Sequence, residues 1–387
     1  MTTCIAAIAA DRSVWTLTPS GKSIAHGAID VPLIWGGWDV QGTESAPFSW
    51  PTWSSDGKQI ACFRLPGKGR NSAALYILDA DGVQAREVAD LGDRLPIYLF
   101  WAPGDQHVAV LTQKGPDLSL SVFSASELGQ ESHMATGSPL FFTWAGPSHV
   151  AAFVGNPTAG PQMQRMAIGA NRASTVLPGR PGNFCAPLWM GERAVFVHHE
   201  PNKTQLVTSS ALDAELHVLE NLEGLVAMSA SPDGRTIARA LATDGDGTPY
   251  RQLGLVDVVT GEVRELTDAP CLAYMWSPDG KAIITARVDT RKNLLSWQRI
   301  DLNGEVTPLA ELYPSRDLGF YLRFFEQYSQ SHHLMDPSGR YLLLPGNLLG
   351  RGDPNGPGRL WRVDLQNGEI EDIADGVFGV YAPTLAG

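Results

Sequence analysis

The densest group of side chains able to do chemistry lies in residues 326–333, which read Glu-Gln-Tyr-Ser-Gln-Ser-His-His. This run holds a carboxyl group, two amides, three hydroxyls and two imidazoles. Ser331 and His332 have the types of a nucleophile and its base, but adjacency in the chain is not the geometry of a catalytic triad. The chemistry of the run therefore depends on the elements that bring other residues to it.

No other pattern adds a recognisable catalytic set. His198 and His199 end an expected strand, where neighbouring side chains point to opposite faces and do not easily bind one ion together. The sequence has neither a Gly-x-Ser-x-Gly nucleophile elbow nor a Gly-x-Gly-x-x-Gly dinucleotide fingerprint. We therefore expect no catalytic residues.

Composition argues against several classes of protein. The 387 residues include 29 Lys and Arg against 41 Asp and Glu, which gives a formal net charge of −12. This balance argues against a general nucleic-acid binder, which carries a basic footprint. No apolar run approaches the roughly 18 residues of a membrane span. With 40 Gly and 27 Pro, the chain is expected to make many turns.

These turns follow an internal repeat. Its clearest copies are Trp-Ser-Ser-Asp-Gly-Lys at 53–58 and Trp-Ser-Pro-Asp-Gly-Lys at 276–281. Including weaker copies, the anchor positions are 53, 101, 144, 189, 230, 276 and 335, and five of the six spacings lie between 41 and 48 residues. That period is typical of a β-propeller blade. Gly-containing turns within each unit predict four strands per blade, named a to d.

The two ends of the chain complete the pattern. Residues 381–385 echo residues 49–53 and predict an a strand, while residues 4–9, 13–17 and 24–29 predict strands b, c and d. Pairing the two ends in one blade would remove the exposed edges that an open ring leaves.

We therefore predict an all-β fold with a single domain over residues 1–387, an eight-bladed β-propeller whose closing blade contains both termini. Seven blades is the alternative, in which residues 336–340 or 184–220 form an insertion rather than part of a blade.

The repeat resembles that of the TolB-type propellers, which is also found in the propeller domains of prolyl-oligopeptidase-like peptidases and in oligogalacturonate lyases. The resemblance rests on the Trp-Ser-Pro-Asp-Gly-Lys phrase and covers nearly the whole chain. It implies a fold and not a function, because the phrase consists of a turn and a packing residue.

The resemblance to oligogalacturonate lyases also implies a metal site. The Gln and His run before the turn at 336–340 is similar to the manganese-binding segment of those enzymes, so Gln327 and His332 would stand for ligands. Gln330 stands where that family has a His, and a metal needs three or four ligands at one place. We expect no cofactor, with a divalent metal at His332 and Gln327 as the alternative.

Long insertions predict where a partner would bind. In a propeller the d–a and b–c loops share one face, and the long ones here are residues 30–49, 64–73, 311–330 and 346–359. Loops of this length are usually functional or disordered, and Trp, Tyr and Arg are common anchors of binding hot spots. The candidate binding residues are Trp35, Trp38, Trp50, Arg70, Arg316, Tyr321, Arg323, Glu326, Tyr328 and Arg351.

The cysteines and the N-terminal residues predict a compartment. Cys4, Cys62, Cys185 and Cys271 lie far apart in apolar surroundings, which is typical of buried thiols and not of a disulfide framework. The first residues lack the basic start and apolar length of a signal peptide. We predict a cytoplasmic protein.

Two hypotheses of function follow. The first is a non-enzymatic binding scaffold that uses the d–a and b–c loop face to contact a protein partner or a larger assembly, with a small anionic ligand as a further candidate. The second is a metal-assisted enzyme acting at the channel mouth, such as a lyase on acidic sugars.

Overall fold

The computed structural model describes residues 3–18, 23–26, 47–67, 71–82, 84–169, 173–182, 185–210, 215–242, 249–292, 294–351, 353–354 and 356–383. The chain forms two compact units. The first unit comprises residues 1–133, 310–321 and 331–387, and the second unit comprises residues 134–309 and 322–330.

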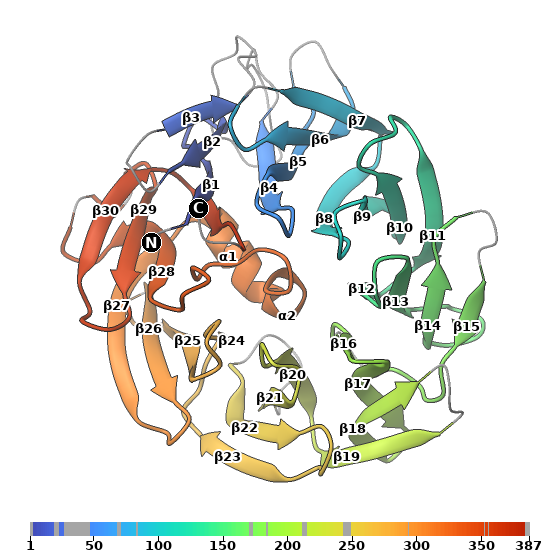
Figure 1. Cartoon of the computed structure of the whole chain (residues 1–387). Helices are drawn as coiled ribbons and strands as arrows, with labels where there is room; N and C mark the ends of the chain where they lie inside the picture. Colours follow the sequence, from blue (N-terminus) through green and yellow to red (C-terminus); the bar gives the residue numbers. More distant parts are fainter. Residues whose placement is uncertain are drawn as a thin grey trace. The chain divides into compact units, whose positions relative to one another are not determined.

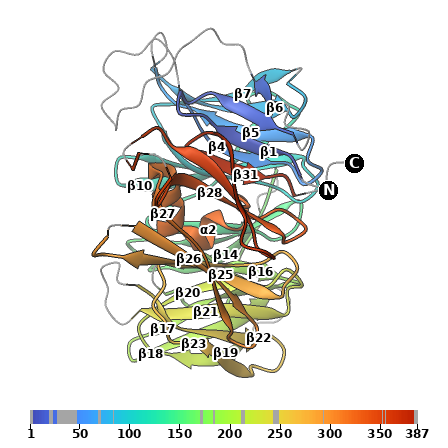
Figure 2. The ribbon, with the colours of Figure 1, turned by 90° about the vertical axis from the view of Figure 1, so that its left-hand side faces the viewer.

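The second unit contains four-stranded antiparallel sheets in which each strand pairs with the next along the chain (Figures 1 and 2). The innermost strands β12, β16, β20 and β24 are neighbours in that order. The strands are β12 (Leu140–Trp144), β13 (His149–Val154), β14 (Gln162–Ala167), β15 (Ser174–Val176), β16 (Leu188–Met190), β17 (Arg193–Glu200), β18 (Lys203–Ser210), β19 (Leu216–Leu222), β20 (Leu225–Ala230), β21 (Thr236–Ala242), β22 (Arg251–Asp257), β23 (Val263–Thr267), β24 (Ala273–Trp276), β25 (Ala282–Asp289), β26 (Leu294–Asp301) and β27 (Val306–Pro314).

The first unit is built from the same kind of sheet, and the last residues of β27 belong to it. Its strands are β1 (Ile5–Ile8), β2 (Val14–Leu17), β3 (Ser23–His26), β4 (Phe48–Trp53), β5 (Gln59–Arg64), β6 (Ala73–Asp79), β7 (Ala85–Gly92), β8 (Leu95–Trp101), β9 (His107–Lys114), β10 (Asp117–Ser124), β11 (Glu131–Gly137), β28 (Tyr341–Leu348), β29 (Arg359–Asp364), β30 (Ile370–Asp375) and β31 (Phe378–Tyr381). β11 begins in this unit and ends in the second.

The pairing of the two chain ends is confirmed. β31 pairs antiparallel with β1, with Ile5 opposite Tyr381 and Ile8 opposite Phe378. β1 then pairs with β2, and β2 with β3, so one sheet has its a strand from the C-terminal end and its other three from the N-terminal end.

The turn at residues 336–340 departs from the expected pattern. The a strand predicted before it is reduced to a single bridge between Met335 and Leu342. On its far end, β28 pairs with the last residues of β27, where Leu312 lies opposite Leu348. The choice between eight and seven blades therefore stays a prediction.

The repeated phrase builds both a turn and a contact. In the copy at 276–281 the Ser277 hydroxyl donates to Asp279 Oδ1 at 2.6 Å, and the Lys281 N–H donates to the same oxygen at 3.1 Å. Gly280 has φ +68°, a backbone conformation that favours glycine. The indole N–H of Trp276 donates to the carbonyl of Ser229 in β20 at 3.1 Å. One copy thus closes its own hairpin and binds the preceding sheet.

Replacing Phe378 tests how much the stability of the first unit depends on β31. Its side chain is almost fully buried, and its ring centroid lies 5.1 Å from that of Trp50 and 6.0 Å from that of Tyr321. We expect Phe378→Ala to lower the free energy of unfolding by about 3–5 kcal/mol, the range for a large buried ring. Urea denaturation measures this.

The matched control for Phe378→Ala is Val259→Ala, at a side chain that is 79% exposed. Its effect should stay within about 0.5 kcal/mol. Equal losses in the two variants would contradict the view that β31 is part of the core.

Candidate functional site

Two short helices replace the long loop that was predicted between β27 and β28. They are α1 (Arg316–Arg323) and α2 (Phe325–Tyr328). The buried residues Leu318, Tyr321, Leu322 and Phe325 have the i, i+3, i+4, i+7 spacing of a helix face. Ser315 caps α1, because its hydroxyl accepts the N–H of Leu318 at 3.1 Å. The expectation of an irregular loop was wrong, and the apolar spacing was the signal that could have corrected it.

Helix α2 lies against the inner strands of the second unit. It contacts β12, β20 and β24 (Figure 1). The amide of Gln327 binds both backbone groups of Phe142 in β12: Oε1 accepts the N–H at 3.1 Å, and Nε2 donates to the carbonyl at 2.7 Å. Gln330 Nε2 donates to the carbonyl of Pro187 at 3.3 Å. These side chains act as an edge partner for the inner strands.

Glu326 is the most strongly perturbed acid of this region. Its side chain is 8% exposed, and Oε1 accepts the N–H of Met228 at 3.0 Å and the thiol of Cys185 at 3.2 Å. Burial raises its pKa to about 8, although both hydrogen bonds favour the charged form. Glu326 is therefore mainly protonated at neutral pH.

The thiol of Cys185 is unreactive in this setting. Burial, and then the neighbouring Glu326 carboxyl, raise the pKa of Cys185 well above its usual value. The thiolate is the reactive form of cysteine, so Cys185 acts as a hydrogen-bond donor and not as a nucleophile.

Aromatic rings pack against Phe325 of α2. Phe325 packs on Tyr274 at 4.9 Å between ring centroids and on Tyr250 at 6.0 Å. The Tyr274 hydroxyl lies 2.7 Å from the carbonyl oxygen of Ala227. The surroundings of Glu326 are thus apolar apart from groups that already bond to one another.

His332 lies in the first unit and is fully buried. Its ring centroid is 5.9 Å from Trp50 and 5.8 Å from Tyr98. Its Nδ1 lies 2.7 Å from the Ser331 hydroxyl, which also donates to the Tyr98 hydroxyl at 2.8 Å. Burial lowers the pKa of His332 to about 3, so the imidazole is neutral.

The predicted binding residues divide into three groups. Trp35, Trp38 and Arg70 lie outside the described residues. Trp50 is partly buried against the rings around His332, and Tyr321, Glu326 and Tyr328 are buried. Helix formation turns Tyr321, Glu326 and Tyr328 inward, so they do not line an open face, and their role in binding stays a prediction. The exposed members are Arg316, Arg323 and Arg351, and Arg351 donates to the carbonyl of Ile370 at 3.1 Å.

The predicted metal ligands do not meet within one unit. His332 belongs to the first unit and Gln327 to the second, where the Gln327 amide bonds to Phe142. Within the described part of the chain, no three His, Cys, Asp or Glu side chains are grouped as a metal ion would need. A divalent metal at His332 and Gln327 stays a prediction.

Comparison with known proteins gives the fold. The structure of the dihydro-heme d1 dehydrogenase NirN in complex with DHE is similar over 98% of this chain and 75% of that one, at 14% identity and a TM-score of 0.61. An oligogalacturonate lyase in complex with manganese is similar over 82% and 88%, at 14% identity and a TM-score of 0.50. This chain has a β-propeller fold. At these identities the likeness shows the fold alone.

TolB from Acinetobacter baumannii is itself among the similar structures, at 15% identity and a TM-score of 0.43. The match covers 72% of this propeller but only 65% of the TolB chain. No known family's sequence model matches the propeller, and no curated protein sequence matches it. In the described residues, no helix is long and apolar enough to cross a membrane.

Replacing Glu326 tests whether its burial sets a pH dependence. A carboxyl group whose pKa is about 8 in the folded protein and near the usual 4.5 in the unfolded chain binds more protons when folded. The free energy of unfolding therefore falls as pH rises from about 4.5 to 8. We expect Glu326→Gln to reduce this fall, by as much as roughly 4 kcal/mol, in urea denaturation at pH 5, 6.5 and 8.

Glu223→Gln, at an exposed carboxylate of the same unit, is the control and should keep the slope of the unmodified protein. If Glu326→Gln keeps the full slope as well, Glu326 is not the group responsible.

Proposed function

We propose that this propeller is a non-enzymatic binding scaffold and that the outward face of α1 contacts a protein partner. The observation that carries the proposal is the exposure of Arg316, Phe320 and Arg323. Their i, i+4, i+7 spacing places them on one face of the helix, opposite the buried Leu318 and Leu322.

The chemistry of this face fits a protein surface. Phe320 is 38% exposed although it lies beside the ring of Trp50, 5.4 Å between centroids. The guanidinium of Arg323 lies 5.8 Å from the ring centroid of Phe324, which is 37% exposed. Exposed rings beside arginines are typical of binding hot spots. The partner patch that fits is apolar with carboxylates at its rim, and small anions are further candidates for the two arginines.

The surroundings of α2 favour binding over catalysis. The polar side chains of α2 bond to backbone groups of the inner strands, and Cys185 stays protonated. An enzyme in the channel mouth would need acid and base groups that a substrate can reach. The alternative of a metal-assisted lyase gains no support from the described positions of His332 and Gln327.

The free thiols fit a reducing compartment. Cys4, Cys62, Cys185 and Cys271 are all unpaired with one another, and disulfides are rare in the cytoplasm. We therefore include a cytoplasmic location in the proposal.

Site-specific photo-crosslinking in the protein's own host tests the scaffold. A photo-reactive phenylalanine at position 320 or 324 should capture a discrete partner, identified by mass spectrometry. The yield should fall at least five-fold with Arg316→Glu and Arg323→Glu together, because the pairing with acidic groups is reversed.

The same probe at Leu128 and at Val259, which are 67% and 79% exposed, is the control for general stickiness. Capture of the same species from the control positions, or the absence of any species from positions 320 and 324, would exclude this face as the interface.

Metal analysis tests the enzymatic alternative separately. We expect untagged protein purified from its host to carry less than 0.1 equivalent of any transition metal, by elemental analysis and native mass spectrometry. A stoichiometric metal that is lost on His332→Ala but retained in Glu223→Gln would favour the metal-assisted lyase over the scaffold.

A further inference from the structure

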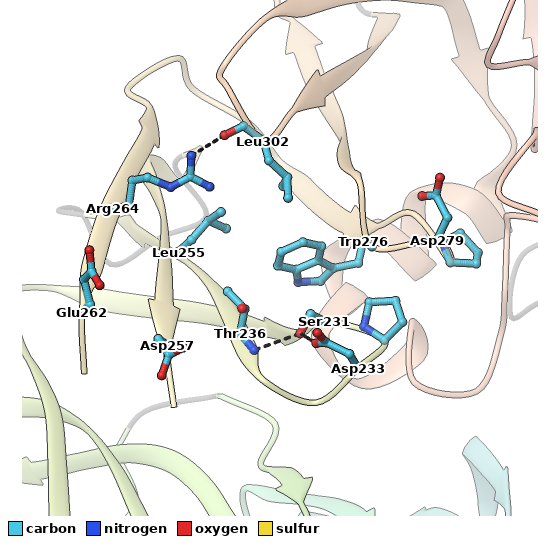
Figure 3. Close-up of a pocket in the computed structure, with 13 residues that line it drawn as sticks. Ser231, Asp233, Thr236, Leu255, Asp257, Glu262, Arg264, Trp276, Asp279 and Leu302 are labelled. Atoms are coloured by element: carbon cyan, nitrogen blue, oxygen red, sulfur yellow. Dashed lines mark hydrogen bonds between the residues drawn. The ribbon is translucent and has the colours of Figure 1, made fainter. Parts of the chain in front are cut away.

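A cavity of about 640 Å³ lies in the second unit where the sheet of β20–β23 meets the sheet of β24–β27 (Figure 3). It opens between the Asp-Gly turns that follow β20 and β24 and the turn between β22 and β23. Its volume lies in the range of about 300–1,000 Å³ that binding pockets have. None of its residues belongs to α1 or α2.

The cavity has an apolar base. Figure 3 shows the indole of Trp276 pointing from its strand towards Leu255, with Leu302 beside the two. The hydrogen bond from the Trp276 N–H to Ser229 holds the indole in place. A ring fixed in this way is a ready platform for a flat or cationic group.

Acidic groups surround this base. The lining contains four carboxylates and one guanidinium, that of Arg264, which donates to the carbonyl of Leu302 (Figure 3). The carboxylates are those of Asp233, Asp257, Glu262 and Asp279. Lys281 pairs with Asp279 at 3.6 Å, so Asp233, Asp257 and Glu262 are the carboxylates that complement a cation.

The turns hold two of these carboxylates in place and keep them charged. Asp233 Oδ1 accepts the Ser231 hydroxyl at 2.6 Å, and Asp257 Oδ1 accepts the N–H groups of Val259 and Thr260 at 2.9 and 2.8 Å. These bonds lower the pKa of both acids. These bonds fix both carboxylates within their own turns.

We propose that this cavity binds an arginine side chain presented by a segment of a protein partner. The carboxylates would accept hydrogen bonds from the guanidinium, and its flat face would lie on Trp276. The apolar base would cover the methylene groups of the side chain. Lysine has the charge but lacks the planar group. The proposal goes beyond the contact through α1, and either surface can fail without the other.

Labelled peptides test the proposal directly. A fluorescein-labelled pentapeptide with one central arginine is titrated with the full-length protein at about 0.15 M salt, where long-range attraction to an acidic protein is screened. Fluorescence polarisation should give an affinity at least ten-fold higher than for the same peptide with citrulline, which keeps the shape and loses the charge.

Matched charge reversals locate the site. Glu262→Lys, at an exposed lining residue, should weaken binding of the arginine peptide at least five-fold. Glu223→Lys makes the same change in net charge at an exposed residue outside the cavity, and it should weaken binding less than two-fold. Circular dichroism checks that both variants fold.

Four results would overturn the proposal: equal affinity for the arginine and citrulline peptides, equal loss in the two Lys variants, no binding at millimolar protein, or displacement of the peptide by micromolar spermidine. The last result would assign the cavity to a small polyamine in place of a protein segment. None of these results affects crosslinking through α1.

Discussion

The hydrogen bond from the repeat tryptophan to the preceding inner strand is the interaction on which the sheets of each unit depend. In the second unit it joins Trp276 to Ser229, and in the first it joins Trp101 to Thr52 and Trp53 to Val380, each at 3.1 Å. A buried carbonyl left without a partner costs about 1–3 kcal/mol. The ring also fills the gap between two sheets, so one residue type supplies both packing and polar pairing. The Trp53 bond reaches the C-terminal strand and ties together segments from opposite ends of the chain.

Helix α2 also pairs buried backbone groups, at the inner strands of the second unit. Gln327 pairs with Phe142 and Glu326 with Met228, so side chains take the place of a neighbouring strand. Buried polar groups that are fully paired favour one arrangement over others, because any shift leaves them unpaired. Both hydrogen bonds to Glu326 favour its charged form, but burial outweighs them and raises its pKa to about 8. The amphipathic spacing of α1 leaves Arg316, Phe320 and Arg323 exposed.

The sequence predicts those features that depend on local pattern. The repeat spacing and the Asp-Gly turns predict the strands, and the echo between the two termini predicts the pairing of Ile5 with Tyr381. The helices were missed because the propeller pattern assigns long insertions to loops. The partners of Glu326 were beyond reach: Cys185 and Met228 lie 141 and 98 residues away in the chain. Only the register of several sheets brings them together, and no local signal encodes that register. The cavity around Trp276 could not be predicted for the same reason. Its carboxylates form hydrogen bonds within their own turns, and they come together only when two sheets pack.

A shifted pKa often marks an active site. In Glu326 and His332 the shift is caused by burial inside the fold. Glu326 and His332 belong to the densest group of reactive side chains in the sequence. Both are mainly neutral at neutral pH because burial removes them from water. A general acid must reach a substrate atom to within about 3 Å. Glu326 Oε1 already accepts the Met228 N–H and the Cys185 thiol, and His332 Nδ1 lies 2.7 Å from the Ser331 hydroxyl. Charged groups that solvent can reach are found on α1 and at the turns beside Trp276. Buried groups of this kind hold the sheets together, and the proposed binding depends on polar residues at the surface.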